Sequence, residues 1–362
     1  MISTTRRYFI RNLSLAGSSL LLPSYLWANR PKKKNLGVAL VGLGYYSTDL
    51  LAPALQHTQH CHLAGIVTGT PSKIDRWQRQ YNIPDKNVYN YGNMDRIANN
   101  PDIDVIYIVL PTSMHAEYAI RAAKIGKHVW CEKPMARTEK ECAAVIKACQ
   151  DNKVKLSIGY RMQHEPNTQE IIRLGREKVY GKVKTVAASA GYFDGRSDHW
   201  KQKKAMGGGA MYDMGVYTLQ AARYCTGEEP ISVTASHSTK RPHIYTEVDE
   251  TTHYQLEFPS GATATCTTSL GKGMNNLKAT YANGWASLTP FQAYGGIQGR
   301  TSDGKKLNAS IPNQQAKQMD DDALAIIENT SVLVPGEEGL RDIRVVEAIY
   351  RAAASGQRVF IK

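Results

Sequence analysis

The sequence predicts an α/β protein, in which an N-terminal, doubly wound parallel sheet is followed by an α+β domain with an open, mainly antiparallel sheet. Three observations predict this architecture. A glycine-rich turn at Gly42 and Gly44 directly follows the apolar run of residues 36–40. Apolar strand-like runs then alternate with helical segments as far as residue 158, and the pattern changes to partly alternating strands after Tyr160. A length of 362 residues also favours two domains over one core.

Residues 1–30 are typical of an export signal and are left out of the fold prediction. Residues 5–11, TRRYFIR, resemble a twin-arginine box, and the apolar stretch 13–22 that follows is too short to span a bilayer. The alternative is a chance arginine pair in a basic, amphipathic N-terminus. We expect export of the folded protein by the twin-arginine route to the periplasm, and no later apolar run is long enough to predict a membrane span.

Composition argues against several other classes of protein. The chain is 42% hydrophobic and 21% charged, which is ordinary for a globular protein and unlike a disordered or fibrous one. Its formal charge of +13 comes from scattered basic residues without a helix-turn-helix or RNA-binding signature, so nucleic acid is not an expected partner. A basic surface and export signal explain the charge, and a pocket for phosphates or acidic sugars is the alternative. The six cysteines form no CxxC pair, and we expect neither a metal site nor a disulfide framework.

The first domain is expected over residues 31–158, as a dinucleotide-binding Rossmann domain. The run 105–110 is continuously apolar and rich in β-branched residues, which marks a strand buried on both faces. Thr138, with Glu141 three residues later, forms a capping-box pattern at a helix start. Strands alternating with helices predict right-handed crossovers in a parallel sheet. In order, we expect strands at 36–40, 62–67, 88–91, 105–110, 128–131 and 154–158, and helices at 49–57, 72–81, 115–125 and 138–149.

The second domain is expected over residues 159–362, with substrate binding and oligomerisation as its tasks. Its strands show the partial alternation of an open antiparallel sheet, and residues 258–261 form a turn between two of them. A buried helix and a closing helix, which can return to the first domain, complete it. The strands are expected at 182–192, 231–236, 251–258 and 262–269, and the helices at 211–224 and 343–355.

The first turn of the parallel sheet is a candidate phosphate-binding site. Gly42 and Gly44 allow a tight turn and a close approach of the backbone to a pyrophosphate, which would rest on the following helix N-terminus. Ser47 stands where the motif has a third glycine, a departure that weakens it. An ordinary strand–turn–helix junction is the alternative.

The end of the second strand indicates which dinucleotide binds. A protein that selects NAD usually has a carboxylate here for the ribose hydroxyls, but residues 68–73 are TGTPSK and the first acid is Asp75. Hydroxyls and the Lys73 ammonium suit a 2′-phosphate, and Arg76 can add charge. We therefore favour NADP, with NAD as the open alternative. If Lys73 is only a solvated helix residue, the argument for NADP fails.

Two further strand ends would face the same ligand, because ligands of doubly wound sheets lie outside the carboxyl ends of the strands. Leu110 and Pro111 end one strand, and His115 follows, where it is expected to cap or pack rather than to catalyse. The pentapeptide 131–135, CEKPM, ends another strand and places Lys133 beside the nicotinamide. A lysine there suggests hydride chemistry on a carbohydrate-like hydroxyl or carbonyl.

Together these motifs resemble the glucose–fructose oxidoreductase and inositol dehydrogenase superfamily, and most of all its glucose–fructose oxidoreductase members. The resemblance covers nearly the whole chain after residue 30, and its motifs are highly specific in combination. They are the Gly42 turn, residues 111–115, Glu132-Lys133-Pro134, Gly159-Tyr160-Arg161 and the triple glycine 207–209 that leads to Asp213 and Tyr217.

The resemblance implies roles for the matching residues. Glu132 would hold the nicotinamide ribose, and Lys133 would contact the substrate hydroxyl and tune proton transfer, next to Pro134, whose peptide bond is often cis in the family. Asp213 and Tyr217 would complete the catalytic group, with Tyr217 as general acid or base, since a nearby ammonium favours phenolate. A helix cap or core pair is the alternative for these two, because residues four apart share one helix face.

The resemblance also implies contacts to the rest of the dinucleotide. Thr68, Lys73 and Tyr91 match positions around a 2′-phosphate. The remaining candidates for cofactor or pocket contacts are Tyr45, Tyr46, Gly69, Leu110, Pro111, His115, Arg161, Trp200 and Tyr294.

The expected function is that of an exported, NADP-dependent sugar oxidoreductase. Hydride would pass from C1 of an aldose to a tightly bound nicotinamide, giving a lactone, and a second sugar could take it back and become an alditol. One alternative is an exported glycosidase or lyase that oxidises the sugar transiently; Tyr217, where many relatives carry histidine, argues against it. The other is a non-enzymatic binding protein, which the intact set of Lys133, Asp213 and Tyr217 disfavours. A sugar is the expected small-molecule partner, and a homo-oligomer through the open sheet is the expected assembly.

Overall fold

The computed structural model describes residues 33–361. The described residues from 35 onward form one compact unit, and the account below concerns that unit alone. The predicted export signal, residues 1–30, lies outside the described residues. Within the described part, no helix is both long and apolar enough to cross a bilayer.

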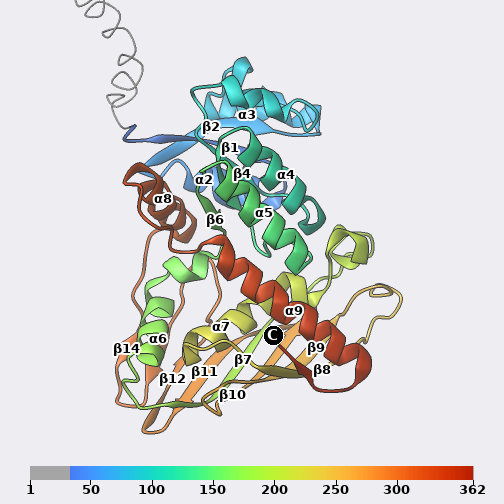
Figure 1. Cartoon of the computed structure of the whole chain (residues 1–362), viewed down its shortest axis with the longest axis vertical. Coiled ribbons are helices and arrows are strands. Elements are labelled where there is room, and N and C mark those ends of the chain that lie inside the picture. Colours follow the sequence, from blue (N-terminus) through green and yellow to red (C-terminus); the bar gives the residue numbers. More distant parts are fainter. Residues whose placement is uncertain (1–32, 362) are drawn as a thin grey trace, which may run out of the picture. The chain divides into compact units, whose positions relative to one another are not determined.

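A parallel sheet of six strands forms the first half of the unit, in the order β3-β2-β1-β4-β5-β6 (Figure 1). This confirms the predicted doubly wound sheet. The strand order reverses between β1 and β4, and ligands of such sheets bind outside the strand ends at this point. The strands are β1 (Leu36–Val41), β2 (Cys61–Val67), β3 (Val88–Tyr89), β4 (Val105–Ile108), β5 (His128–Cys131) and β6 (Leu156–Ile158).

Helices connect these strands, and two of them begin earlier than predicted. The first begins as a π-helical turn at Tyr46 and continues as the short α2 (Ala52–Ala54), so the expected start at Asp49 is wrong. Pro53 lies in α2, directly after the π-helical turn, and therefore donates no backbone hydrogen bond within this helical segment. Another, α4 (Thr112–Lys124), begins directly after Pro111. The other helical segments are α3 (Ile74–Tyr81), α5 (Glu139–Asp151) and the 3₁₀ turns Pro71–Lys73, Asp85–Asn87 and Met94–Asn99.

The start of α5 shows half of the predicted capping box. The Thr138 hydroxyl accepts a hydrogen bond from the Glu141 backbone N–H at 3.1 Å, as an N-cap does. The Glu141 carboxylate accepts from the backbone N–H of Arg137 at 2.9 Å, not from that of Thr138. The helix is therefore capped, but the reciprocal bond reaches one residue further back.

A mixed, mainly antiparallel sheet of nine strands forms the second half, in the order β14-β13-β12-β11-β7-β10-β9-β8-β15. Neighbouring strands are antiparallel except for β7 and β10. Along β9, Tyr254 and Leu256 are buried while His253 and Gln255 are exposed, so one face is packed and the other is polar. The predicted open sheet is confirmed. The strands are β7 (Val183–Phe193), β8 (Ser232–Ser238), β9 (Thr251–Glu257), β10 (Thr263–Ser269), β11 (Gly271–Tyr281), β12 (Gly284–Leu288), β13 (Gly299–Thr301), β14 (Lys306–Leu307) and β15 (Val359–Phe360).

Helices α6 (Pro166–Arg176), α7 (Val216–Thr226) and α9 (Gly336–Ser355) cover the packed face of this sheet (Figure 1). A π-helical turn, Met211–Gly215, leads directly into α7. The closing helix α9 begins before the predicted residue 343, and it packs on both halves of the unit. Two helices of this half were not predicted, α6 and α8 (Gln314–Ile327), and α8 packs into the core of the first half.

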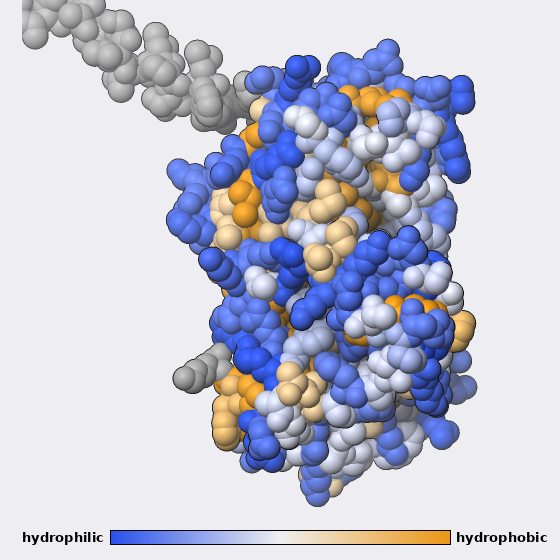
Figure 2. Space-filling view, turned by 90° about the vertical axis from the view of Figure 1, so that its right-hand side faces the viewer, coloured by the Kyte–Doolittle hydropathy of each residue, from blue (hydrophilic) through white to orange (hydrophobic). Residues whose placement is uncertain are grey.

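The face shown in Figure 2 is mostly hydrophilic, with hydrophobic side chains in small, separate groups. Two large exposed hydrophobic residues, Tyr45 and Tyr294, are 66% and 48% exposed and border the cavity described below. The six cysteines are buried and none forms a disulfide. Aromatic rings that remain exposed beside a cavity are available for contact with a bound molecule.

A buried carboxyl group on α8 links stability to pH. The Asp322 side chain is fully buried; its Oδ1 accepts a hydrogen bond from the Ser157 hydroxyl at 2.7 Å, and its Oδ2 has no protein hydrogen-bond partner. Burial raises the pKa of Asp322 to about 6, although His164 and Ser157 act in the opposite direction. The unfolded-state value is about 3.9. The folded state therefore holds the proton more tightly, and stability falls as the pH rises through this window.

We expect Asp322→Asn to remove this loss of stability. Between about pH 4 and pH 6 the wild-type free energy of unfolding should fall by about 2–3 kcal/mol from this group alone. The variant cannot ionise there, and it should be the more stable protein at about pH 8. Urea unfolding at about pH 4.5 and pH 8, followed by tryptophan fluorescence, measures the difference. Asp151→Asn, at an exposed carboxylate, is the control, and an unchanged pH dependence in Asp322→Asn would contradict the prediction.

Candidate active site

A cavity of about 960 Å³ lies at the carboxyl ends of the first-sheet strands and is also lined by residues of the second half. All predicted catalytic and cofactor-binding residues line it, with the exception of Gly69. Lys133 comes from the end of β5, and Asp213 and Tyr217 come from the helical segment before and within α7. The structure therefore brings these residues together, while their individual roles stay predictions.

The glycine turn after β1 presents backbone to the cavity. Gly42 has φ +93°, a conformation that other residues rarely adopt, and a Cβ there would lie 2.4 Å from the Val109 carbonyl oxygen. A Cβ at Gly44 would meet no atom within 4 Å, so this residue borders open space. Ser47 takes the third position of the motif, and its buried hydroxyl donates to the Gly42 carbonyl at 2.5 Å. The serine thus stabilises the turn, which still fits a pyrophosphate.

The end of β2 carries hydroxyls and a lysine. Lys73 Nζ donates to the Leu43 carbonyl at 2.6 Å, which holds the ammonium beside the glycine turn. Gly69 does not line the cavity as predicted: a Cβ there would lie 2.7 Å from the Tyr91 ring, so its lack of a side chain lets this ring pack on the backbone. Among the residues of this strand end that line the cavity, none is acidic. The hydroxyl-bearing residues of this part of the cavity are Thr68 and Thr70 after β2, and Tyr91 after β3.

Glu132 follows β5, and its carboxylate is buried. The Tyr107 hydroxyl donates to Glu132 Oε1 at 2.6 Å, and Gln318 Nε2 donates to the Tyr107 oxygen at 3.0 Å. A Cβ at Gly159 would lie 2.6 Å from the same carboxylate oxygen, so the glycine leaves room for it. Burial raises the pKa of Glu132 to about 7, although Tyr107 and Lys133 oppose the shift. Near neutral pH this group can donate or accept a hydrogen bond at a ribose hydroxyl.

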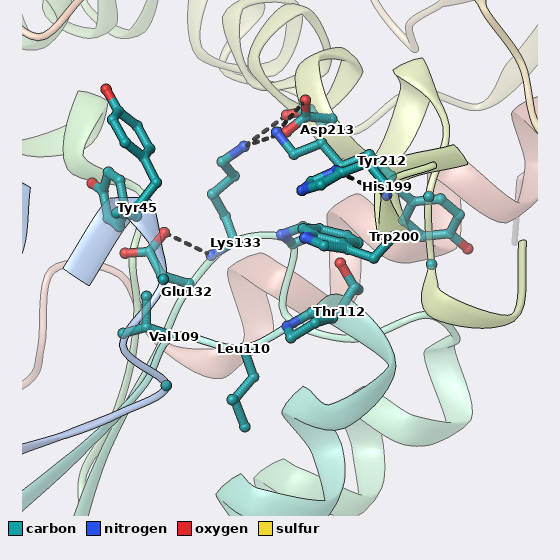
Figure 3. A pocket seen from close by; sticks show the side chains of 18 of the residues that line it. Tyr45, Val109, Leu110, Thr112, Glu132, Lys133, His199, Trp200, Tyr212 and Asp213 are labelled. Carbon is teal, nitrogen blue, oxygen red and sulfur yellow. Dashed lines mark hydrogen bonds and ion pairs between the residues drawn. The ribbon is translucent and has the colours of Figure 1, made fainter. Parts of the chain in front are cut away.

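The Lys133 side chain points toward Asp213 (Figure 3). Its Nζ donates to the Asp213 backbone carbonyl at 2.6 Å and lies 3.8 Å from Asp213 Oδ1. The same ammonium lies 4.7 Å from the centroid of the Tyr217 ring. The peptide bond between Lys133 and Pro134 is cis. An ammonium held between a carboxylate and a phenol is suited to assist proton transfer at a hydroxyl group.

Two residues that sequence reasoning missed hold the Asp213 carboxylate from the other side. Lys201 Nζ donates to Asp213 Oδ2 at 2.8 Å, and the Tyr192 hydroxyl donates to the same oxygen at 2.9 Å. Burial alone would raise the pKa of Asp213, but Lys201 and Lys133 outweigh it and lower the pKa to about 2. Asp213 is therefore an anion at neutral pH.

Arg161 forms a buried part of the cavity wall. Its guanidinium carbon lies 4.7 Å from the Tyr294 ring centroid and 5.7 Å from that of Tyr217. Arg161 Nη1 donates to the Ala293 carbonyl at 2.7 Å. These contacts place the guanidinium beside both tyrosine rings, and the cofactor or pocket contact predicted for Arg161 stays a prediction.

His115 lines the cavity but is occupied by the backbone. Its Nδ1 lies 2.8 Å from the Pro134 carbonyl oxygen and its Nε2 lies 2.7 Å from that of Leu110. Burial lowers the pKa of His115, although both carbonyls oppose the shift. The ring therefore joins the ends of β4 and β5, in agreement with the expectation that it packs rather than catalyses.

Several of the other missed residues come from the segment 194–209, between β7 and the turn before α7. A cluster of Arg, His, Trp and Lys immediately before the triple glycine was the available signal, but only Trp200 was selected from it. Figure 3 shows His199 and Trp200 on the same side of the pocket as Asp213. Cavity residues that were not selected include Val109, Thr112, Tyr192, Arg196, His199, Lys201, Tyr212, Met214, Asn275 and Gln292.

Comparison with known proteins identifies two family matches. Residues 36–160 match the oxidoreductase family with an NAD-binding Rossmann fold (GFO/IDH/MocA). Residues 168–284 match the GFO/IDH/MocA C-terminal domain. The two matches fall on the parallel sheet and on the first part of the open sheet respectively.

Solved structures and curated relatives are similar over most of the chain. The crystal structure of aldose-aldose oxidoreductase from Caulobacter crescentus complexed with glycerol is 40% identical, covers 90% of this chain and 100% of that chain, and has a TM-score of 0.87. The D-xylose 1-dehydrogenase [NADP(+)] of Haloarcula marismortui is 24% identical over 331 residues, which is 89% of this chain and 92% of the relative. Levoglucosan dehydrogenase in complex with NADH and levoglucosan is 22% identical, with a TM-score of 0.78 over 90% of this chain and 99% of that one, and shows the fold alone.

Proposed function

We propose, from the premise that this chain belongs to the GFO/IDH/MocA oxidoreductase family, that it uses NADP to oxidise an aldose at C1. Membership and the sugar-acting relatives establish the broader activity, an NAD(P)-dependent sugar oxidoreductase. The observation that carries the finer proposal is the grouping of Lys133, Asp213 and Tyr217 in the cavity that also holds the glycine turn. The relative named aldose-aldose oxidoreductase supports an aldose as the substrate.

The cavity residues fit a nicotinamide dinucleotide. The positive φ of Gly42 makes the tight turn, the backbone at Gly44 borders open space that a pyrophosphate can approach, and Lys73, held beside this turn, is the proposed partner of a 2′-phosphate. Glu132 is positioned as a partner for the nicotinamide ribose, with Tyr107 fixing its carboxyl group. When bound, the nicotinamide supplies the hydride chemistry.

The protein's own groups handle the proton of the sugar hydroxyl. Tyr217 is the proposed acceptor of that proton during oxidation and its donor during reduction. The Lys133 ammonium stabilises negative charge on the phenol and on the sugar oxygen. Asp213 remains ionised and accepts a hydrogen bond from the sugar, which orients the reacting carbon.

A sugar panel tests this proposal. The full-length protein is purified without added cofactor, scanned for the absorbance and fluorescence of bound reduced nicotinamide, and titrated with aldoses, ketoses and aldonolactones. Discharge of the reduced signal by one sugar, and its return with another, would support the ping-pong exchange that gives lactone and alditol. Cleavage of an aryl glycoside without net redox change would favour transient oxidation by a glycosidase or lyase, and no response to any sugar would contradict both.

Lys73 is the proposed determinant of the preference for NADP. We expect Lys73→Met to weaken NADP binding by about 10- to 100-fold, because a charge-assisted contact to the 2′-phosphate is lost, and to leave NAD binding nearly unchanged. Fluorescence titration of the cofactor-free protein with both dinucleotides measures the ratio. Arg79→Met removes the same charge from an exposed position on α3 and is the control. An equal loss for NADP and NAD in Lys73→Met would contradict this role.

We also propose that the protein is exported by the twin-arginine route to the periplasm, on the strength of residues 5–11. A cofactor loaded before export and held tightly would then be reoxidised by a second sugar instead of exchanging. Fractionation of cells that express the wild type or Arg6→Lys/Arg7→Lys tests this, with retention of the double variant inside the cell as the expected result.

Self-association through the outer face of the second sheet is the proposed assembly. This face is polar, with His253, Gln255 and Lys278 exposed on it, and it has no covering helix within the described residues. Sedimentation of the full-length protein at several concentrations tests for a dimer or a larger oligomer, and a monomer at all concentrations would contradict the proposal.

A further inference from the structure

The carboxylate of Asp213 is held by three groups that come from different parts of the chain. Lys133 reaches it from the end of β5, Tyr192 from β7, and Lys201 from the segment between β7 and α7. Lys201 Nζ also donates to the Tyr192 oxygen at 3.1 Å, which closes a triangle of Lys201, Tyr192 and Asp213. The Lys133 side chain is 14% exposed, that of Lys201 is 21% exposed and that of Asp213 is 12% exposed, so water screens these charges little.

In this triangle, one oxygen of the Asp213 carboxylate is fully hydrogen-bonded and the other is not. The Tyr192 hydroxyl and one Lys201 N–H both bond Oδ2, which uses the lone pairs of that oxygen. Oδ1 lies 3.8 Å from Lys133 Nζ, beyond a direct hydrogen bond. Oδ1 therefore retains acceptor capacity in the cavity, between an ammonium and the space that the sugar would enter.

The backbone fixes Lys201 relative to Asp213 through the triple glycine. Gly209 N donates to the Lys201 carbonyl at 2.8 Å, and Asp213 N donates to the Gly209 carbonyl at 3.1 Å, so a short chain of bonds joins the two residues. A Cβ at Gly208 would lie 2.3 Å from the Lys201 carbonyl oxygen, and one at Gly209 would lie 2.2 Å from Asp249 Oδ1. The consecutive glycines thus permit the tight backbone packing that places Lys201 beside the helix that bears Asp213.

We propose that Lys201 and Tyr192 are positioning residues that keep Asp213 ionised and turn its Oδ1 toward the sugar, so that Asp213 orients the substrate and does not carry the reaction's proton. This inference rests on the proposed sugar oxidoreductase activity. It assigns proton transfer to Tyr217 with Lys133, because an anion fixed by Lys133 and Lys201 is a poor proton acceptor.

The other charged and titratable groups near Asp213 do not replace Lys201. Arg196 is engaged by the Asp194 carboxylate through bonds of 2.8 and 2.7 Å. Burial lowers the pKa of His199, and the neighbouring Arg196 and Lys201 lower it further, so the ring is neutral at physiological pH. The balance at Asp213 therefore depends on burial, which raises its pKa, against the two lysines, which lower it to about 2.

Direct titration of Asp213 tests the inference without depending on turnover. The full-length protein is labelled with ¹³C at aspartate carboxyls, and the Asp213 signal is assigned by its loss in Asp213→Asn. In the wild type the signal should keep its carboxylate position down to about pH 4. In Lys201→Met the midpoint should rise by about 1–3 units, since an opposite charge is removed from a buried carboxylate. Tyr192→Phe should shift it less, and Lys201→Arg should restore the wild-type position.

Lys203→Met is the matched control. Lys203 lies two residues away, is half-exposed, and pairs with the exposed Asp198 at 2.8 Å, outside the cavity. An unshifted Asp213 midpoint in Lys201→Met, or an equal shift in Lys203→Met, would overturn the inference.

Kinetics separate this inference from the proposed function. If the protein oxidises aldoses, kcat/KM of Lys201→Met should gain an acidic limb and fall by about tenfold per pH unit below the new midpoint, with little change in cofactor affinity. If the wild type oxidises no sugar while the Asp213 signal shifts as expected, the proposed function fails and the electrostatic role stands. If the protein is active and the pH profiles of Lys201→Met and the wild type superimpose, the positioning role fails alone.

Discussion

Replacing Lys133 with methionine should lower kcat for sugar oxidation by about 10²–10⁴-fold, the usual contribution of a positioned group in proton transfer. Methionine keeps much of the apolar stem but removes the ammonium that lies 4.7 Å from the Tyr217 ring centroid and 2.6 Å from the Asp213 carbonyl oxygen. The phenol then loses the positive charge that stabilises its ionised form. Steady-state kinetics with an excess of aldose measure the loss, because KM effects are then removed.

The cofactor affinity of the variant shows whether its loss of activity comes from the chemical step or from misfolding. The Glu132 carboxyl remains anchored by Tyr107 in Lys133→Met, so the affinity for the dinucleotide should change by less than about tenfold. Lys147→Met, at an exposed lysine on α5 that pairs with Asp151, is the control and should keep wild-type kinetics. A Lys133→Met variant that retains full kcat, or one that loses the cofactor as completely as it loses activity, would contradict a role in proton transfer.

The first half of the fold was predictable because its strands are buried on both faces. Such strands appear in the sequence as continuous apolar runs, and residues 105–108 are buried without exception. Motif residues at the carboxyl ends of these runs come together because the topology of a doubly wound sheet brings those ends to one edge. The sequence alone was therefore enough to assign Lys133 and the Gly42 turn to one site.

The second half was harder because its strands have one polar face and weak periodicity. Strand β11 contains glycines, asparagines and lysines, and many of its side chains are only partly buried, so it lacks a clear apolar pattern. Helix α8 carries buried glutamines and Asp322 where it packs against the first half, and tertiary contacts rather than local sequence place it there. Nothing in the local pattern of either segment distinguishes it from a solvated loop.

The same contrast between the two halves of the fold explains why Tyr192 and Lys201 were not predicted. Tyr192 reaches Asp213 from the end of β7 and Lys201 reaches it from the 3₁₀ turn Trp200–Gln202, and no spacing rule relates those residues to Asp213. Gly69 was selected for its place in a motif, but it acts by leaving space for the Tyr91 ring. The topology of the first sheet therefore accounts for Lys133 and the glycine turn, the family resemblance supplied Asp213 and Tyr217, and Tyr192 and Lys201 are placed by side-chain packing that neither signal describes.

Arg223→Met should destabilise the protein by about 3–5 kcal/mol, because it leaves the buried carboxylate of Asp342 without a counter-charge. Arg223 Nη1 donates to Asp342 Oδ1 at 2.6 Å, and the two side chains are 4% and 0% exposed. This pair joins α7, which bears Tyr217, to α9. Gln220 Nε2 donates to the other Asp342 oxygen at 2.8 Å but cannot neutralise its charge. Urea unfolding at about pH 8 measures the loss.

The pH dependence of this loss identifies its cause. Burial raises the pKa of Asp342 to about 6 even with Arg223 opposing the shift. Without Arg223 the pKa must rise further, and a raised folded-state pKa makes stability fall as the pH rises. The cost of Arg223→Met should therefore be smaller at about pH 5, where the carboxyl is protonated, than at about pH 8.

Two further variants show whether the loss of stability comes from an unpaired buried charge or from a lost contact. Arg223→Met/Asp342→Leu removes both charges and should recover much of the stability, because apolar groups often replace a buried ion pair without loss. Arg173→Met breaks ion pairs with Glu170 and Glu177 on the surface of α6, and it should cost less than about 1 kcal/mol. If Arg223→Met costs no more than Arg173→Met, or if the double variant is less stable than the single one, the pair does not secure α7 through its charges. The position of Tyr217 beside Lys133 would then depend on the apolar packing of α7 against the sheet alone.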